Sequence, residues 1–183
     1  MQSNNLYTYC RNNPLKYKDP SGDEGVAALM LWDAFFGGGK TQDYTNNIMV
    51  VNTFDSSPIL NATVNGKLGE FKNMSVSSHI FSDSISFYGN DLNPKDLDLH
   101  LGVGKANYTM EFRKESVKKR FLWKTWTEIE YSVKITISDT YNFDEYREGT
   151  SISNYLNNFG YDLQKNGDIT PYSWSVTFVK KGL

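Results

Sequence analysis

The sequence predicts an α+β domain dominated by antiparallel β-sheet, in the form of an open barrel or a strongly twisted sheet. Residues 127–138 alternate apolar and polar side chains, which is typical of a strand with one face on a core and one face in water. An amphipathic stripe near 151–165 and a short apolar segment near 24–36 predict two helices. The 183 residues are enough to build one core of this kind.

Local patterns indicate the other elements in order along the chain. The apolar helix near 24–36 runs into three glycines at 37–39, which suits a C-cap followed by a linker. We therefore expect 23–45 to be a helix and linker that precede a β-rich domain over 46–183. Asn65-Gly66 is the pair that a two-residue hairpin turn prefers. Apolar or alternating runs predict strands at 48–51, 80–88, 108–113, 127–138 and 172–178.

Two features complete the predicted fold. The charged segment between Phe112 and Leu122 is expected to turn the chain into a long hairpin. The helix near 151–165 is expected to end at Asn166-Gly167. Its apolar stripe consists of Ile152, Tyr155, Leu156, Phe159 and Leu163. An alternative for the helix near 24–36 is a membrane-active segment, because an apolar helix of that length inserts only in part.

Composition narrows the classes of function. Aromatic residues make up 15% of the chain and charged residues 22%, which is too aromatic and too weakly charged for disorder. The formal net charge of −2 gives no strong nucleic-acid signal, although a local basic patch is compatible with it. The single cysteine, Cys10, excludes an intrachain disulfide and a cysteine-based zinc site. We expect no signal peptide in this chain and no transmembrane segment, because the longest apolar run, Val26 to Phe36, falls short of the ~20 residues that spanning requires.

The first 22 residues differ in composition from the rest and carry a spaced motif. Asparagine, tyrosine, proline and glycine follow the order N-x-Y-x-Y-x-x-N-N-P-x-x-x-x-D-P-x-G between residues 5 and 22. The matching residues are Asn5, Tyr7, Tyr9, Asn12, Asn13, Pro14, Asp19, Pro20 and Gly22. This pattern closely resembles the end of the Rhs/YD-repeat associated core module.

The resemblance implies a function class for the remainder of the chain. In that family the core module closes a large β-shell, and the sequence beyond it is a variable C-terminal domain that is often a toxin. The implied protein is bacterial, secreted or on the cell surface, and the implied partners are the shell and a cognate immunity protein. The alternative is a non-catalytic binding or structural module of such a protein. The sequence determines neither a reaction nor a cofactor.

The strongest candidate for catalysis follows the strand at 127–138. If that strand continues, Asp139 takes the parity of Ile137 and points toward the core, where a carboxylate needs a partner or a function. Arg147 is the natural partner, and Tyr141 offers a hydroxyl nearby. With Asp144 these residues could form an acid/base site for a phosphorylated or glycosidic substrate. The alternative is a structural corner in which Asp139 satisfies backbone N–H groups and Arg147 holds it in place.

A second, short resemblance covers the same segment. Asp139 and Tyr141 resemble the D-x-Y-D signature of colicin M-type bacteriocins, which cleave the lipid-linked peptidoglycan precursor, and Arg147 could stand for that family's arginine. Asn142 replaces the second aspartate of the signature, and Tyr146 stands where the histidine would be. The resemblance would therefore imply a relative without an obvious catalytic base.

A candidate metal site lies in Asp96-Leu97-Asp98-Leu99-His100-Leu101. On a strand, Asp96, Asp98 and His100 would share one face, and two carboxylates with an imidazole suit a divalent cation. The same alternation also describes a strand with one face in water.

A basic and aromatic cluster is the last candidate site. Trp123 and Trp126 flank it, and its cations are Arg113, Lys114, Lys118, Lys119, Arg120 and Lys124. Basic side chains with interleaved aromatics could bind a single nucleic-acid strand, as a nuclease payload would. The alternative is the solvated tip of a hairpin.

Overall fold

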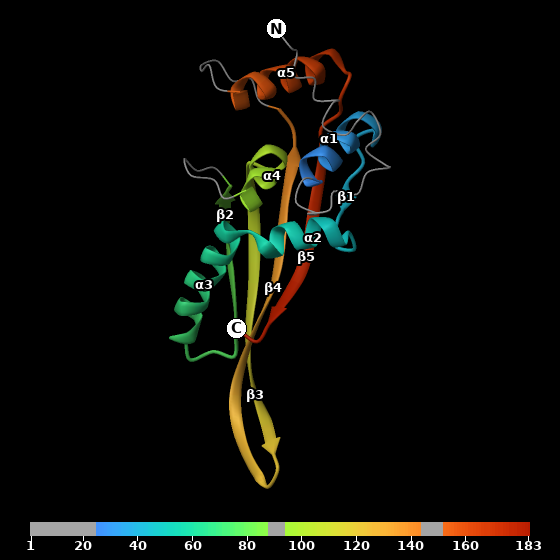
Figure 1. Ribbon diagram of the computed structural model, residues 1–183. Helices are drawn as coiled ribbons and strands as arrows, with labels where there is room; N and C mark the ends of the chain where they lie inside the picture. Colours follow the sequence, from blue (N-terminus) through green and yellow to red (C-terminus); the bar gives the residue numbers. More distant parts are fainter. Residues whose placement is uncertain (1–24, 88–93, 144–151) are drawn as a thin grey trace.

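The fold is an open, five-stranded sheet with helices packed on it, in a computed structural model that describes residues 25–87, 94–143 and 152–183. Within these ranges the strand order is β1-β5-β4-β3-β2 (Figure 1). The short strand β1 is parallel to β5, and the other pairs are antiparallel. The strands are β1 (Gln42–Asp43), β2 (Ser78–Ser86), β3 (Lys105–Phe121), β4 (Lys124–Tyr141) and β5 (Tyr172–Lys181). The predicted fold class is confirmed.

The helices confirm two of the sequence predictions and add three elements. The apolar segment near 24–36 forms α1, and the amphipathic segment near 151–165 forms α5, which ends at Gly167 with a φ of 82°. The helices are α1 (Val26–Phe36), α2 (Ile48–Ser56), α3 (Pro58–Lys72), α4 (Pro94–Gly102) and α5 (Ile152–Asn166). None of the described helices has both the length and the apolar character needed to cross a bilayer.

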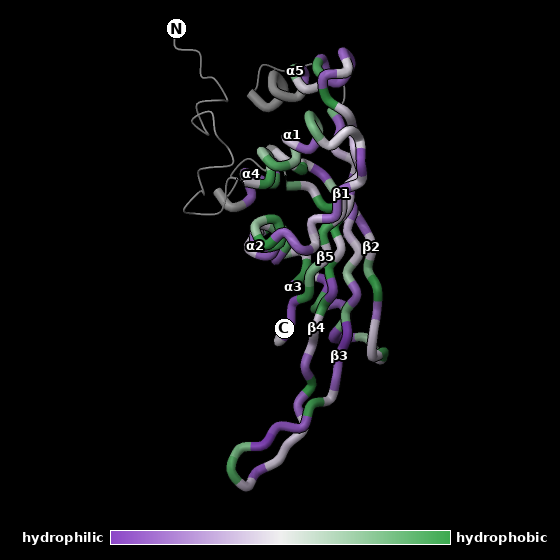
Figure 2. The backbone as a smooth tube through the Cα atoms, turned by 90° about the vertical axis from the view of Figure 1, so that its right-hand side faces the viewer, coloured by the Kyte–Doolittle hydropathy of each residue, from purple (hydrophilic) through white to green (hydrophobic). Residues whose placement is uncertain are grey.

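One face of the sheet carries the core. Figure 2 shows α1, α2, α3 and α4 on the same side of the strands, while α5 lies at one end. Alternate side chains of the three central strands are buried on this side: Tyr108, Met110, Phe112, Val133, Ile135, Ile137, Tyr172, Trp174, Val176 and Phe178. The opposite face is rich in hydroxyls, and Thr136 and Thr177 face each other there with their Oγ1 atoms 3.0 Å apart. The alternation predicted for 127–138 and 172–178 is therefore the burial pattern of the sheet.

The predictions of a strand at 48–51 and a hairpin at Asn65-Gly66 are wrong, because both segments are helical. Asn47 caps α2 by accepting hydrogen bonds from the backbone N–H groups of Met49 and Val50. Ser57 caps α3, and Pro58 occupies its first turn, where proline is favourable. The buried residues of α3 recur at helical spacing, at Leu60, Val64, Leu68 and Phe71. Asn65 and Gly66 lie on the exposed side of this helix, so their turn preference is overruled.

The helix α1 belongs to the main core and is not part of a separate linker. Val26, Met30 and Ala34 are buried in the same cluster as the sheet residues. The helix crosses α4 so closely that a Cβ on Gly102 would lie 2.7 Å from the Cα of Ala27. The unit that contains the sheet therefore begins before residue 46, with α1, and the glycine-rich segment after α1 leads directly into β1.

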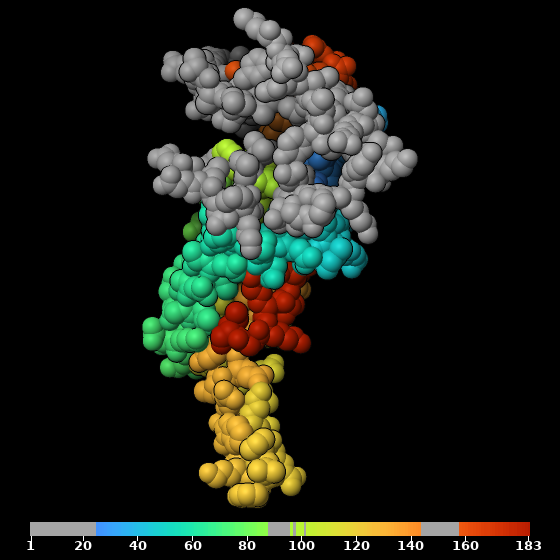
Figure 3. Space-filling model, viewed as in Figure 1, coloured from blue at the N-terminus to red at the C-terminus, as the bar shows by residue number. Residues whose placement is uncertain are grey.

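The strands β3 and β4 continue beyond the rest of the sheet. The last residue of β3 that pairs with β2 is Arg113, and the first residue of β4 that pairs with β5 is Ser132. Beyond these residues, 114–131 form a ladder only with one another, and we call this two-stranded ribbon the arm. The base of the arm stays bonded to the body, because the N–H of Lys114 donates to the Ser77 carbonyl and the Tyr131 carbonyl accepts from the N–H of Gly182. Figure 1 and Figure 3 show it as a narrow projection from the body. The predicted long hairpin is confirmed, but the segment between Phe112 and Leu122, expected to turn the chain, is itself part of β3. The turn lies farther along, between Phe121 and Lys124.

Candidate functional site

The predicted catalytic segment begins at the end of β4. Asp139 pairs with Trp174 of β5, and Tyr141 pairs with Tyr172. Asp139 is partly exposed on the strand. Asp144 and Arg147 lie outside the described residues, as does Tyr146 of the bacteriocin-like segment. The four-residue acid/base site therefore stays a prediction.

Tyr141 has a packing role that the sequence did not indicate. Its ring stacks on Tyr172 at a centroid distance of 5.5 Å and meets the edge of Phe143 at 5.4 Å. Burial raises the pKa of the Tyr141 hydroxyl, so the phenol stays protonated at neutral pH. Tyr141 is accordingly suited to donate a hydrogen bond and unsuited to act as a phenolate base.

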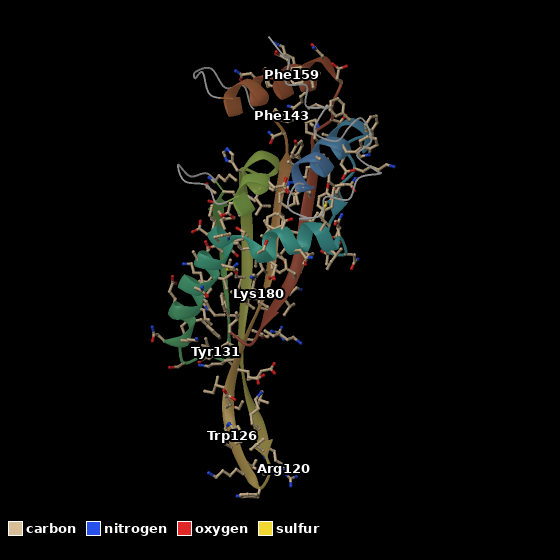
Figure 4. The ribbon with its side chains drawn as sticks, in the orientation of Figure 1. Arg120, Trp126, Tyr131, Phe143, Phe159 and Lys180 are labelled. Atoms are coloured by element: carbon tan, nitrogen blue, oxygen red, sulfur yellow. The ribbon has the colours of Figure 1, made fainter. Side chains whose placement is uncertain are left out.

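Phe143 anchors α5 to the end of the sheet, and Figure 4 shows it beneath that helix. The backbone N–H of Phe143 donates to Oε1 of Gln164 at 3.0 Å, and Nε2 of Gln164 donates back to the Phe143 carbonyl at 3.4 Å. The ring of Phe143 lies over Gly160, where a Cβ would come within 2.4 Å of a ring carbon. Gly160 therefore allows the close approach of α5 to β4, and it is not merely a weak point in the helix.

A buried tyrosine pair joins α1 to the sheet beside Tyr141. The Tyr44 hydroxyl donates to Oδ2 of Asp33 at 2.6 Å, and the Tyr172 hydroxyl donates to the Met30 carbonyl at 2.9 Å. The two hydroxyl oxygens lie 3.1 Å apart. Burial is the largest cause that raises the pKa of both tyrosines, and for Tyr44 the carboxylate of Asp33 raises it further. Both phenols are therefore neutral groups that hold α1 in place.

The candidate metal site is not assembled. Residues 96–101 lie in α4, so the strand prediction is wrong, and on a helix Asp96 and Asp98 do not share a face. The described part of the chain contains no group of three or more histidine, cysteine, aspartate or glutamate side chains arranged to hold a metal ion. Burial lowers the pKa of His100, the third member of the predicted set.

The two aspartates instead stabilise the starts of other helices. Asp96 is buried and accepts a hydrogen bond from the hydroxyl of Ser57, whose Oγ in turn accepts from the backbone N–H of Leu60 in α3. Asp98 accepts from the backbone N–H groups of Val26 and Ala27, the first two residues of α1. Each carboxylate thus serves a different helix N-terminus, where negative charge is favourable.

The basic cluster is divided between the body and the arm. In the body, Arg113 forms an ion pair with Glu111. Lys114, the first residue of the arm, donates to the Met74 carbonyl of the body at 2.9 Å. On the arm, Lys119 forms an ion pair with Glu130. Within the described residues, no ion pair involves Lys118, Arg120 or Lys124. All three side chains are exposed to water.

The end of the arm exposes large apolar side chains. Phe121 is 70% exposed, Leu122 64% and Trp123 83%. Figure 2 shows apolar residues at this extremity, and Figure 4 shows Arg120 and Trp126 on the distal half with Tyr131 near the base. We call residues 118–126 the arm tip. Large apolar side chains that remain in water at the extremity of a protein mark a binding surface.

The backbone of the turn adds a second unusual feature. Leu122 has a φ of 52° and is the one non-glycine residue with a positive φ among those described. Asparagine or glycine adopts this conformation more easily, and a larger side chain costs about 1–2 kcal/mol there. The turn thus contains a leucine where hairpin stability favours a small or polar residue, which is the kind of local strain that accompanies functional sites.

Comparison with known proteins finds no match to this chain among family models, curated proteins or solved structures. The sequence indicated the basic and aromatic composition of the arm tip but not its exposure. The signal that could have found it is the apolar triplet Phe121-Leu122-Trp123 with basic residues on both sides. The arm tip is the site that this structure best supports.

Proposed function

We propose that residues 25–183 form the C-terminal effector domain of an Rhs-type bacterial protein and that this domain binds its target through the arm tip. The N-terminal motif supports the first part, because it resembles the end of the module that precedes such domains. The partners implied are the shell of the parent protein and an immunity protein. A secreted or cell-surface parent would bring the domain to a neighbouring cell.

The exposed arm tip is the observation that carries the binding role. Fully burying a phenylalanine or leucine side chain is worth about 1.5–3 kcal/mol, and this gain is available only when a partner covers the tip. Lys118, Arg120 and Lys124 lie beside the apolar side chains without ion pairs in the described residues. The complementary target is a surface that offers both apolar area and negative charge.

Growth of a bacterial host that expresses the complete chain tests the proposal. The chain is produced in cytoplasmic and periplasm-directed forms, and circular dichroism of the purified protein confirms that each variant is folded. The tip variant combines Phe121→Ser, Leu122→Asn and Trp123→Ser. Its matched control combines Ile48→Ser, Ile80→Ser and Val179→Ser, which replace exposed apolar residues of the body. An Asp139→Ala variant tests the catalytic alternative.

We expect growth inhibition from one compartment that the tip variant loses and that both the control and Asp139→Ala keep. Inhibition that only Asp139→Ala removes would replace the arm-based role with catalysis near β4. Normal growth from both compartments with folded protein would contradict the effector role and favour the alternative of a non-catalytic binding or structural module.

A further inference from the structure

The arm tip has the shape and chemistry of an element that enters a membrane surface. The arm contributes eight paired residues from each strand beyond the sheet, 114–121 and 124–131, which extends it by roughly 25 Å. Its extremity is the turn Phe121–Lys124, so the apolar side chains there would meet a flat surface before any other part of the molecule. Figure 3 shows no other described segment beside the distal part of the arm.

We propose that the arm tip inserts shallowly into the interface of an anionic lipid bilayer. The inference rests on the proposed role of the arm as the target-binding element and names the chemistry of the target. An apolar surface buried about 5–10 Å into the headgroup region is the depth at which interfacial elements bind. A turn bearing Phe121, Leu122 and Trp123 fits that depth, and its strands remain hydrogen-bonded to each other, as a low-dielectric surface requires.

The distribution of charge along the arm supports an anionic surface. Residues 116–127 contain four basic residues and no acidic residue, and the acidic residues of the arm, Glu115, Glu128 and Glu130, lie closer to the body. Lysine and arginine have long apolar stems, so Lys118, Arg120 and Lys124 can keep their charges at the level of lipid phosphates while the turn lies deeper.

The aromatic residues of the arm tip also match the bilayer interface. Trp123 in the turn is 83% exposed, and Trp126 in β4, three residues later, is 47% exposed. Tryptophan concentrates at the boundary between headgroups and hydrocarbon because its ring is apolar and its indole N–H is polar. Trp126 pairs across the arm with Lys119, so a tryptophan and a lysine are cross-strand neighbours just behind the turn.

A nucleic acid explains the arm tip less well. Proteins that grip a single strand place cations along a groove and stack bases on aromatic rings. Leu122 stands at the centre of the apolar triplet and offers neither stacking nor a hydrogen bond to a base. An apolar environment around the turn would account for a leucine at a backbone position that disfavours it.

Vesicle cosedimentation of the complete chain tests the proposal. The probes are vesicles of phosphatidylcholine alone and of phosphatidylcholine mixed with phosphatidylglycerol, at low and high salt. We expect binding to the anionic vesicles that weakens with salt, and little binding to the neutral ones. The combined variant Lys118→Glu, Lys124→Glu should lower the affinity by at least about 25-fold, since each cation near an anionic surface contributes about fivefold. The matched control, Lys105→Glu with Lys134→Glu, makes the same charge change on exposed residues of the body and should retain most of the affinity.

Substitution of the apolar turn separates insertion from simple charge attraction. The variant Leu122→Asn, Trp123→Ser should lose about tenfold or more in affinity while its charge is unchanged. In the parent chain, brominated lipid should quench tryptophan fluorescence, and this quenching should fall sharply in the same variant. Equal loss of binding in the body control, or full binding without Leu122 and Trp123, would overturn the proposal.

The same purified proteins test two other binding partners of the arm tip, a nucleic acid and a second copy of this chain. A labelled single-stranded oligonucleotide that binds through the arm tip, in protein that ignores vesicles, would replace the bilayer with nucleic acid. Tip-dependent dimerisation in sedimentation velocity without vesicle binding would replace it with a second copy. Vesicle binding without growth inhibition would keep this inference and overturn the effector role. Tip-dependent growth inhibition without vesicle binding would overturn this inference alone.

Discussion

Asp98 of α4 caps α1 by accepting a hydrogen bond from the backbone N–H of Val26 at 2.8 Å, across 72 positions of sequence. The same carboxylate accepts from Ala27 at 2.9 Å, so one side chain satisfies two of the N–H groups that a helix start leaves unpaired. Gly25, at the N-cap position of α1, has no side chain to do this locally. A residue predicted to hold a metal is therefore the cap of a distant helix.

Replacement of Asp98 should destabilise the fold. Asp98→Ala removes both hydrogen bonds and leaves the start of α1 without a cap, so we expect the free energy of unfolding to fall by about 1–3 kcal/mol. Urea unfolding followed by circular dichroism measures the change. Asp162→Ala, at an exposed position of α5, is the control and should change stability little. Unchanged stability in Asp98→Ala would contradict the capping role.

Two glycines within helices should respond to alanine with opposite signs. Gly160→Ala places a methyl group against the ring of Phe143 and should destabilise the protein by about 1–3 kcal/mol. Gly66→Ala meets open space on α3 and should stabilise it by about 0.5–1 kcal/mol. Thermal unfolding of the two variants measures both effects. The double variant Gly160→Ala, Phe143→Ala should show a coupling energy, because the two residues touch.

Leu122→Gly should separate stability from binding. Glycine adopts the positive φ of this position without strain, so we expect the arm to gain about 1 kcal/mol of local stability. Loss of the apolar side chain should at the same time weaken vesicle binding. Amide hydrogen exchange within the arm measures the local stability. Faster exchange in Leu122→Gly than in the parent would show that Leu122 is not strained.

The tyrosine pair should make stability fall in alkali. Both Tyr44 and Tyr172 have pKa values raised above the ordinary 10.0 in the folded state. The unfolded chain therefore loses these protons first, and the folded state binds more protons above that pH. Stability is accordingly full below pH 10.0 and declines as the pH rises above it. Urea unfolding on either side of this pH measures the slope, and Tyr44→Phe should make the decline shallower.

The sheet was predictable because its burial is one-sided. Ile135 and Ile137 alternate with polar residues, and this alternation predicts a half-buried strand whichever helices pack on it. The prediction of a hairpin at Asn65-Gly66 was wrong because the turn preference of two residues is weaker than the preferences of a complete helix. Ser57 caps that helix, and its side chains Leu60 and Val64 are buried in the core.

Long-range contacts explain what the sequence could not show at the predicted metal residues and at the arm. The alternation of Asp96 and Asp98 fits a strand, and only the distant N–H groups that Asp98 caps reveal why the carboxylates are there. The basic residues of the arm can be read from the sequence, but their distance from the rest of the sheet depends on where β2 and β5 end. The end of a neighbouring strand is not encoded in the residues of β3 and β4 themselves.

Arg113 and Ser132 mark the boundary between residues that pack within the sheet and residues that pair only within the arm. On the body side, a substitution disturbs a neighbouring strand or the helices packed on the sheet. On the arm side, beyond the contacts of Lys114 and Tyr131 with the body, the ladder joins each residue only to its partner across a two-stranded ribbon. Such a ribbon is close to the minimum that is stable in water. Substitutions at the arm tip can therefore change its target preference without affecting the stability of the sheet. We expect related chains to keep the residues of the body and to differ at the turn.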